Sequence, residues 1–210
     1  MKGLELKILS KSVQLFNEFG LANVSPNKIA QILGISVGNL TYYYRTKEDL
    51  VDAICDQMYM ESKSYMDIFS LPSLQDFRTT LIKFRELQIA YSFIFDDMVF
   101  ICKKYPKIGD KLRKISQQRL KQGHELVEFY IKTGRLLPEG KDFNYKYFIH
   151  TVWLISTFWS SQGAIQILTK ENKSSYEAVD IIWYMLKPYL TLKGLEEYTE
   201  INVFEKISNQ

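Results

Sequence analysis

The chain has few of the residues on which metalloproteins and disulfide-stabilised proteins depend. Its 210 residues include only two cysteines and two histidines. Cys55 and Cys102 lie far apart in sequence, so they form no metal-type cluster, and two cysteines are too few for a disulfide scaffold. We expect both to be buried free thiols in a reducing cytosol rather than a redox switch. Because no paired carboxylates lie at ligand spacing from His124 or His150, no metal site is predicted.

Catalytic motifs are missing as well. The sequence contains no glycine-rich phosphate loop and no nucleophile elbow, so we predict no enzyme activity, no catalytic residue and no cofactor. Asp96-Asp97 is an acidic pair inside an aromatic segment. Adjacent helical residues point apart, so the pair is not a carboxylate dyad. Two interpretations stay open: solvated carboxylates, or a counter-charge or buried acceptor that meets a ligand.

The sequence also lacks a strong excess of either charge and an unbroken apolar run. Net charge is +3, and residues 1–50 contain six basic and four acidic side chains, 6 − 4 = +2. Any DNA site must therefore rely on the placement of its residues rather than on bulk charge. Residues 147–169 contain no Asp, Glu, Lys or Arg, but polar residues recur throughout and argue against a membrane span. The start of the chain has no apolar signal-peptide core, so we expect a cytoplasmic protein.

What the sequence does contain is a pair of short helices in the stretch 25–47. Ser25 can cap the first helix through its hydroxyl. Gly34 can end that helix, because glycine tolerates the left-handed conformation that helix ends often need. Ser36 can then cap the second helix. The pattern predicts two helices joined by a tight turn.

The second short helix has one inward face and one outward face. Leu40 and Tyr44 are spaced i and i+4, so they point inward together. The residues left mostly outward are Val37, Gly38, Asn39, Thr41, Tyr42 and Tyr43. A helix with small residues at its start and tyrosines at its end suits a DNA major groove, since the backbone can approach base edges and the hydroxyls can bond phosphates.

Four strings of residues in the first quarter of the chain carry a family resemblance. They are Ile8-Leu9 with Leu15-Phe16-Asn17-Glu18-Phe19-Gly20, then Ile29-Ala30, then Gly34-Ile35-Ser36-Val37-Gly38-Asn39-Leu40, and Tyr43-Tyr44 with Lys47-Glu48-Asp49-Leu50. Together they resemble the N-terminal domain of TetR-type (tetracycline-repressor-like) regulators. The family usually has a tyrosine directly after the leucine of its second short helix, where this chain has Thr41. The phosphate contact usually given to that tyrosine is therefore expected from Tyr42 or Tyr43.

These observations predict a set of DNA contacts. Val37, Gly38 and Asn39 are expected at base edges, with Asn39 as the best candidate for hydrogen-bond readout. Lys47 begins the next helix and can clamp a phosphate there. The full predicted set is Ser25, Asn27, Lys28, Ser36, Val37, Gly38, Asn39, Thr41, Tyr42, Tyr43 and Lys47.

The rest of the chain is also expected to be helical, without strands or repeats. Apolar residues of a helix at 3–19 should form a small core with Ile29, Ile32, Leu33, Leu40 and Tyr44. Thr46 with Asp49, Ser73 with Asp76, and Ser174 with Glu177 resemble cap pairs, and Asp142 can cap a further helix. We predict helices from 47 to about 69, from 73 to 105 with a possible break at 91–92, from 107 to 133, at 143–169 and at 175–192, with a charged tail that could hold a short extra helix.

These helices predict a domain division and a dimer. The fold class is all-α, with a three-helix DNA-binding domain at 1–46, a connecting helix at 47–70, and a helical effector-binding and dimerisation domain at 71–210. A helix that is apolar nearly all round needs cover on two sides, and a second copy of the chain can supply one. We therefore predict a homodimer through the helices near 143–169 and 175–192, as in four-helix bundles, and the resemblance implies the same.

The aromatic middle of the chain favours ligand binding over chemistry, because ligand pockets are mostly apolar with a few polar groups. The residues predicted to bind an effector are Phe84, Phe93, Asp97, Phe100, Tyr130, Phe148, Trp153 and Phe158. The resemblance implies an inducer cavity in this part of the fold. We thus predict a ligand-responsive dimeric regulator, most simply a repressor, that binds a near-palindromic operator on double-stranded DNA and is released by a small apolar or aromatic effector. The alternatives are a helix-turn-helix protein without a small-molecule effector, acting in chromosome organisation or through protein partners, and a small helical enzyme.

Overall fold

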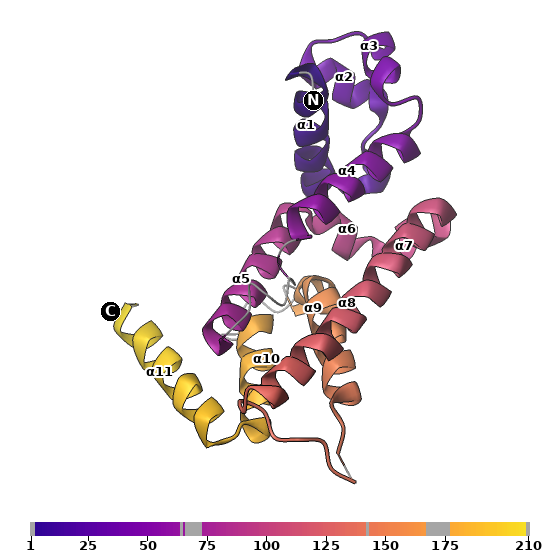
Figure 1. Ribbon diagram of the computed structural model, residues 1–210. Coiled ribbons are helices and arrows are strands. Elements are labelled where there is room, and N and C mark those ends of the chain that lie inside the picture. The colour runs from indigo at the N-terminus through magenta and orange to yellow at the C-terminus, as the bar shows by residue number, and fades with distance from the viewer. Residues whose placement is uncertain (1–2, 64, 66–72, 142, 167–176, 209–210) are drawn as a thin grey trace. The chain divides into compact units, whose positions relative to one another are not determined.

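The computed structural model describes residues 3–63, 65, 73–141, 143–166 and 177–208, without the side chains of 163–166 and 202–208 (Figure 1). Within these ranges the regular elements are helices, accompanied by two isolated β-bridges. The predicted all-α fold is confirmed. The chain divides into two compact units, which are described one at a time. Unit 1 combines Met1–Ser62 with Leu87–Ile115, and unit 2 combines Lys63–Glu86 with Ser116–Gln210.

Unit 1 begins with a small helical bundle. Its elements are α1 (Gly3–Phe19), the 3₁₀ turn η1 (Leu21–Asn23), α2 (Pro26–Leu33), α3 (Val37–Tyr43) and α4 (Lys47–Ser62). The predicted core forms around Ile8, Phe16, Ile29 and Leu40, each at most 1% exposed. The prediction was wrong for Ile32, which is 47% exposed. α2 is only eight residues long, and it buries the side that carries Ile29 and Ala30.

The segment that follows in unit 1 packs on α1 and α4. The predicted 73–105 helix is broken twice, which gives α5 (Leu74–Ala90), α6 (Ser92–Asp96) and α7 (Met98–Lys104), and α8 (Pro106–Lys132) follows. The Asn17 side chain joins α1 to this segment, since its amide donates to Ala90 O at 2.8 Å and accepts from Phe93 N at 3.1 Å. The Lys111 ammonium joins α8 to α4 through Asp52 at 2.5 Å and Asp56 at 2.7 Å.

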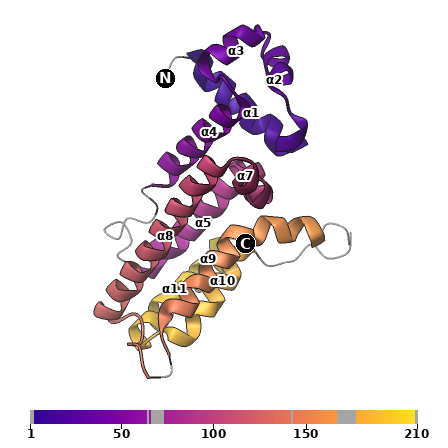
Figure 2. The same cartoon turned by 90° about the vertical axis from the view of Figure 1, so that its right-hand side faces the viewer.

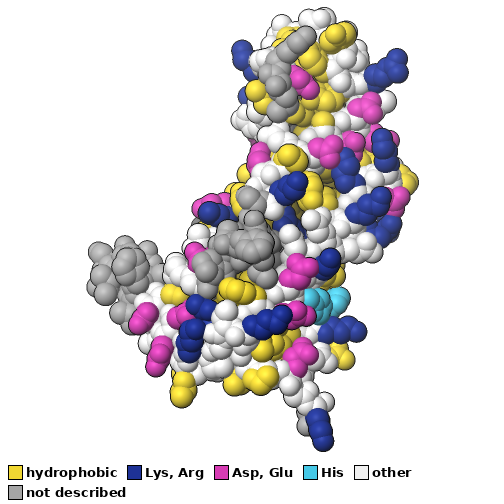
Figure 3. All heavy atoms as spheres, in the orientation of Figure 1, with side chains coloured by type: hydrophobic (Ala, Val, Ile, Leu, Met, Phe, Trp, Pro, Cys, Tyr) yellow, Lys and Arg dark blue, Asp and Glu magenta, His cyan; other side chains and the backbone are white. Residues whose placement is uncertain are grey.

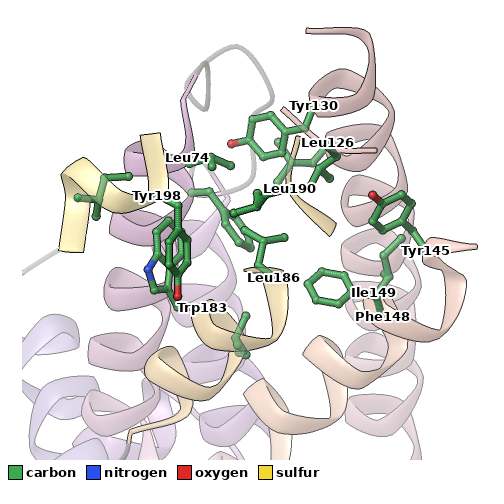
Figure 4. Close-up of a cluster of buried hydrophobic side chains, with 14 residues drawn as sticks. Leu74, Leu126, Tyr130, Tyr145, Phe148, Ile149, Trp183, Leu186, Leu190 and Tyr198 are labelled. Carbon is green, nitrogen blue, oxygen red and sulfur yellow. The ribbon is translucent and has the colours of Figure 1, made fainter. Parts of the chain in front are cut away.

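Unit 2 is a helical core built from α5, α8, α9 (Tyr145–Gln166), α10 (Ala178–Leu186), the 3₁₀ turn η3 (Lys187–Tyr189) and α11 (Leu192–Ser208). The helices α9 and α10 lie side by side (Figure 2). Buried side chains from all five helices meet in one cluster, in which Trp183 and Tyr198 stack with ring centroids 4.8 Å apart (Figure 4). α11 is therefore a 17-residue helix rather than a short extra one, and its Tyr198 and Ile201 belong to the core.

Several predicted boundaries moved. α4 ends at Ser62 rather than near Phe69, and residues 66–69 lie outside the described part of the chain. α10 starts at Ala178 with a capping box of Glu177 and Asp180, later than predicted. Asp142, Ser174 and the 167–169 end of the predicted 143–169 helix also lie outside the described residues. Among the helices that are described, none is both long and apolar enough to cross a bilayer.

Candidate nucleic-acid interface

The two short helices are fixed by local caps, as predicted. The Ser25 hydroxyl accepts from Lys28 N at 3.2 Å at the start of α2. Gly34 ends α2 with φ = 65° in the left-handed region. The Ser36 hydroxyl accepts from Asn39 N at 3.1 Å at the start of α3. The turn between the helices, and with it the direction of α3, therefore follows from residues within a few positions of one another.

The amino-terminal part of α3 is open to solvent. Leu40 and Tyr44 hold the helix to the bundle, with 1% and 7% of their surface exposed, and burial raises the pKa of Tyr44 to about 12. On the other side Val37 is 41% exposed, and Gly38 and Asn39 are exposed as well. A Cβ built on Gly38 would meet only the Ser36 hydroxyl, at 3.7 Å. A flat partner surface can thus approach the α3 backbone closely at this point.

The carboxyl-terminal part of α3 presents tyrosines. Tyr42 is 79% exposed, and its ring meets the half-buried Tyr43 ring edge-on at 5.3 Å between centroids. The Thr41 hydroxyl instead donates to its own helix, to Val37 O at 3.1 Å. The two tyrosines rather than Thr41 are therefore placed for an outside partner.

The start of α4 is more closed than expected. Thr46 and Asp49 form the predicted reciprocal cap, with contacts of 3.0 and 3.1 Å. The Lys47 ammonium, however, donates to Leu21 O inside the unit and lies 5.7 Å from the centre of the Phe16 ring. Burial, followed by the nearby Lys104, lowers the pKa of Lys47. What Lys47 offers a phosphate in this arrangement is its backbone N–H, because the first amides of a helix have no acceptor within the helix.

The remaining predicted DNA contacts lie at the start of α2. Ser25 and Asn27 are exposed. Lys28 is partly exposed, and its ammonium lies 3.8 Å from the centre of the 41% exposed Phe19 ring in a cation–π contact. The exposed beginnings of α2 and α3 thus carry most of the predicted set.

The predicted effector residues fall in both units. In unit 1, Phe93 is buried against Phe16 with ring centroids 5.1 Å apart, Asp97 accepts from Leu21 N at 3.4 Å, and Phe100 is 40% exposed. Asp97 thereby ties the start of α7 to the turn before α2. These contacts give Phe93 and Asp97 clear packing roles in unit 1.

In unit 2 the other five predicted effector residues have different environments. Tyr130 and Phe148 belong to the buried cluster, and the Tyr130 hydroxyl donates to Ser73 O at 2.9 Å. Burial raises the pKa of Tyr130. Trp153 and Phe158 meet edge-on on α9 at 6.0 Å, and they remain partly open, as does Phe84 on α5. Of the five predicted effector residues in unit 2, only these three aromatic side chains are accessible to solvent.

Sequence reasoning missed two arginines on one face of α5. Arg78 lies 3.6 Å from Asp180 and over the Trp183 ring at 5.2 Å. Arg85 donates to Glu177 at 3.1 Å and to Ser160 at 3.2 Å. Their spacing of seven residues was the available signal. Among the described residues, no group of three or more His, Cys, Asp or Glu side chains is placed to hold a metal ion.

Comparisons with known proteins cover almost the whole chain. Residues 8–54 match the family model described as bacterial regulatory proteins, tetR family, and residues 50–198 match the model described as bacterial transcriptional repressor. The HTH-type transcriptional regulator RutR of Escherichia coli O157:H7 is 26% identical over 142 residues, which cover 62% of this chain. The match spans 63% of the length of that relative.

Solved structures show the same fold. A TetR-family transcriptional regulator from Marinobacter aquaeolei VT8 is similar with a TM-score of 0.82 and 25% identity, over 96% of this chain and 97% of that one. A TetR transcription regulator from Haloarcula marismortui is similar with a TM-score of 0.67 and 16% identity, over 91% of this chain and 100% of that one. The second likeness concerns the fold alone.

Proposed function

Because the chain belongs to the TetR family of bacterial transcriptional regulators, we propose that it is a ligand-responsive dimeric repressor whose α3 reads a near-palindromic operator. The observation that supports α3 as the reading element is its capped, solvent-exposed start. Val37, Gly38 and Asn39 are exposed there while Leu40 is buried beneath them. In helix-turn-helix proteins the residues at the start of the second helix contact base edges, and two-fold symmetry of the protein is mirrored in the operator.

Asn39 is the proposed base-reading residue. Its side chain can donate and accept, which suits an adenine edge. We expect Asn39→Ala to lower affinity for a duplex enriched by the wild-type protein by about 1–3 kcal/mol while binding to a shuffled duplex changes little. Fluorescence anisotropy on both duplexes at one salt concentration measures this. Equal losses on the two duplexes would remove Asn39 from the base-reading set.

Tyr43 is proposed to hold the DNA backbone. Tyr43→Ala should weaken binding to both duplexes alike, because phosphate contacts carry no direct sequence information. Tyr43→Phe is the matched control, since it keeps the ring that packs on Tyr42 and removes only the hydroxyl. If the Tyr43 hydroxyl bonds a phosphate, both variants lose affinity for DNA. If neither variant loses affinity, Tyr43 makes no contact with the DNA backbone.

The proposed dimer uses the outer faces of α9 and α10. Tyr147, Leu154 and Phe158 are 73%, 51% and 37% exposed and follow one face of α9 at spacings of seven and four. On α10 the buried stripe faces the core of its own unit, and Tyr184, which is 72% exposed, lies on the outer side. Exposed apolar side chains gathered on two adjacent helices support a pairing surface for a second copy.

The proposed effector is a small apolar or aromatic molecule that binds near Phe84 and Trp153. It lowers DNA affinity if it binds the DNA-incompetent state more tightly than the DNA-bound one. A thermal-shift screen of small aromatic compounds can find such a molecule, and a true effector must also weaken DNA binding. Trp153→Ala should abolish that response and leave DNA binding without the compound unchanged. A response that persists in this variant would place the effector elsewhere.

A regulator without a small-molecule effector is the second candidate. It is supported by Tyr130 and Phe148, which were predicted to line a cavity but lie at 2% and 7% exposure in the packed cluster. For this candidate no compound in the screen changes DNA affinity, and control comes from a protein partner or from the DNA itself.

A further inference from the structure

The net positive charge of unit 1 comes from residues 87–115 rather than from α1 to α4 taken together. Residues 1–62 carry six basic and seven acidic side chains, 6 − 7 = −1. Residues 87–115, the other part of unit 1, carry six basic and three acidic side chains, 6 − 3 = +3. Proteins that bind DNA gain most of their sequence-independent affinity from Lys and Arg that meet phosphates. The helices α1 to α4 supply no net positive charge for this purpose.

All six basic side chains of the second segment fall within residues 103–114. Two of them serve the fold, since Lys111 pairs with Asp52 and Asp56, and Arg113 pairs with Asp110. The other four are exposed, and we call them the α7–α8 basic patch: Lys103, Lys104, Lys107 and Lys114. Figure 3 shows Lys and Arg side chains gathered along the right-hand edge of unit 1, with carboxylates among them.

The helix dipoles explain only two of the four lysines in the α7–α8 basic patch. Lys103 and Lys104 lie in the last turn of α7, where the helix dipole favours a cation. Lys107 lies in the first turn of α8, where the dipole disfavours a cation and no acidic residue is present. Lys114 lies in the body of the same helix. An external anionic partner would explain the presence of Lys107 and Lys114, which the helix dipoles do not explain.

Specific contacts connect α7 and α8, which carry the patch, to the DNA-binding helices. Leu21, in the turn before α2, donates to Asp97 at the start of α7 and accepts from Lys47 at the start of α4. The first turn of α8 packs directly on α7, because a Cβ on Gly109 would lie 3.0 Å from Cys102 O. Burial lowers the pKa of Lys47, and Lys104 is close enough for its positive charge to lower that pKa further. The basic patch therefore belongs to the same compact unit as α3, and its Lys104 lies near Lys47 at the start of α4.

We propose that Lys103, Lys104, Lys107 and Lys114 contact the phosphates of DNA that flanks the sequence read by α3. The inference rests on the proposed DNA-binding function and extends it to a second, sequence-independent surface. Flanking duplex DNA fits the patch because it is a polyanion. It also extends beyond the sequence that α3 of the same unit is proposed to read. The patch increases affinity and association rate on long DNA, while α3 keeps the choice of sequence.

The test compares two variants with the same change of net charge. The patch variant is Lys103→Gln, Lys104→Gln, Lys107→Gln and Lys114→Gln. The control variant changes four exposed lysines of unit 2: Lys83→Gln, Lys121→Gln, Lys132→Gln and Lys141→Gln. Kd is measured against salt concentration on a mixed-sequence duplex of about 40 base pairs, long enough to extend beyond a site of two half-sites one helical turn apart. Matching melting temperatures confirm that both variants fold.

The patch variant should show a smaller salt dependence. Each lost phosphate contact lowers the magnitude of the slope of log K against log salt by about 0.9, so the loss of four contacts lowers it by about 3.6 per subunit. At ~0.1 M salt relative to 1 M this corresponds to a loss of about 4,000-fold per subunit. The control variant should keep the wild-type slope.

The outcomes separate this inference from the proposed function. A patch variant with the wild-type slope, in a protein whose DNA binding is weakened by Tyr43→Ala, overturns the flanking contact and leaves α3 as the DNA-binding element. An equal fall of the slope in both four-lysine variants also overturns it, since net charge alone would then explain the effect. A wild-type protein that binds no duplex at all refutes both the patch and the proposed function.

Discussion

Gly38 lies in the first turn of α3, and replacing it by alanine should move folding stability and DNA affinity in opposite directions. The new Cβ would meet only the Ser36 hydroxyl at 3.7 Å, an ordinary van der Waals contact. Alanine loses less backbone entropy than glycine on entering a helix, so we expect Gly38→Ala to stabilise unit 1 by about 0.5–1 kcal/mol. The perturbation therefore leaves the fold intact while adding a methyl group to the exposed face.

The same methyl group should weaken DNA binding. If the α3 backbone approaches base edges at Gly38, the added carbon displaces a contact at each half-site. A disrupted base contact costs about 1–3 kcal/mol, and every 1.4 kcal/mol is tenfold in Kd. We expect affinity for the enriched duplex to fall at least tenfold.

Denaturant unfolding and fluorescence anisotropy on the same samples test both expectations. Gly140→Ala is the control, because its new Cβ meets nothing within 4 Å and it lies in unit 2, outside α3. It should leave DNA affinity unchanged. A stable Gly38→Ala protein with wild-type affinity would refute the close approach of α3 to a groove.

Four further outcomes follow from the structure. Ser36→Ala removes the acceptor of the α3 cap and should destabilise unit 1 by about 1 kcal/mol in denaturant unfolding, and no change would mean that the cap is redundant. Gly194→Ala places a Cβ 2.2 Å from Arg135 O, so it should destabilise unit 2 by about 3 kcal/mol or lower its yield, whereas a wild-type melting curve would contradict this packing of α11. Cys55 is fully buried, which also raises the pKa of its thiol to about 12, so in a Cys102→Ser background it should react with a thiol reagent at pH 8 only after unfolding, and rapid native-state labelling of that variant would show that Cys55 is accessible. Leu154→Asp should turn the proposed dimer into a folded monomer in sedimentation, and a persistent dimer would exclude this face of α9.

The raised pKa of Cys55 also predicts how stability changes with pH. The folded thiol keeps its proton to higher pH than the unfolded one, so above pH 9 the folded state binds more protons than the unfolded state. Stability should therefore be fully present below pH 9 and decrease as the pH rises toward about 12. Tyr44, with its pKa raised to about 12, changes stability in the same direction above pH 10. Cys55→Ala should reduce the slope between pH 9 and 10.

The DNA-binding helices could be predicted closely because their boundaries depend on local chemistry. Ser25, Gly34 and Ser36 act on amides or dihedral angles within three residues of themselves, and the sequence displays those residues directly. The inward position of Leu40 and Tyr44 follows from helical spacing. Ile32 was misplaced because its exposure depends on how α2 lies against its neighbours, which spacing alone does not determine.

Contacts between distant segments could not be predicted. Asp97 meets Leu21 across 76 positions, and Lys47 turns inward to the same residue across 26. Likewise the capping residues of α10, Glu177 and Asp180, are contacted from α5 by Arg85 and Arg78. Such pairings depend on the tertiary packing of helices, for which a single sequence shows no local signal.

Selection from a library of random duplexes by the wild-type protein tests whether two α3 helices read DNA as a symmetric pair. We expect enrichment of a near-palindromic sequence whose two half-sites are separated by one helical turn, about 10 base pairs, or a multiple of it. Enrichment of a single asymmetric site, or of no sequence at all, would contradict a symmetric pair of α3 helices as the reading element.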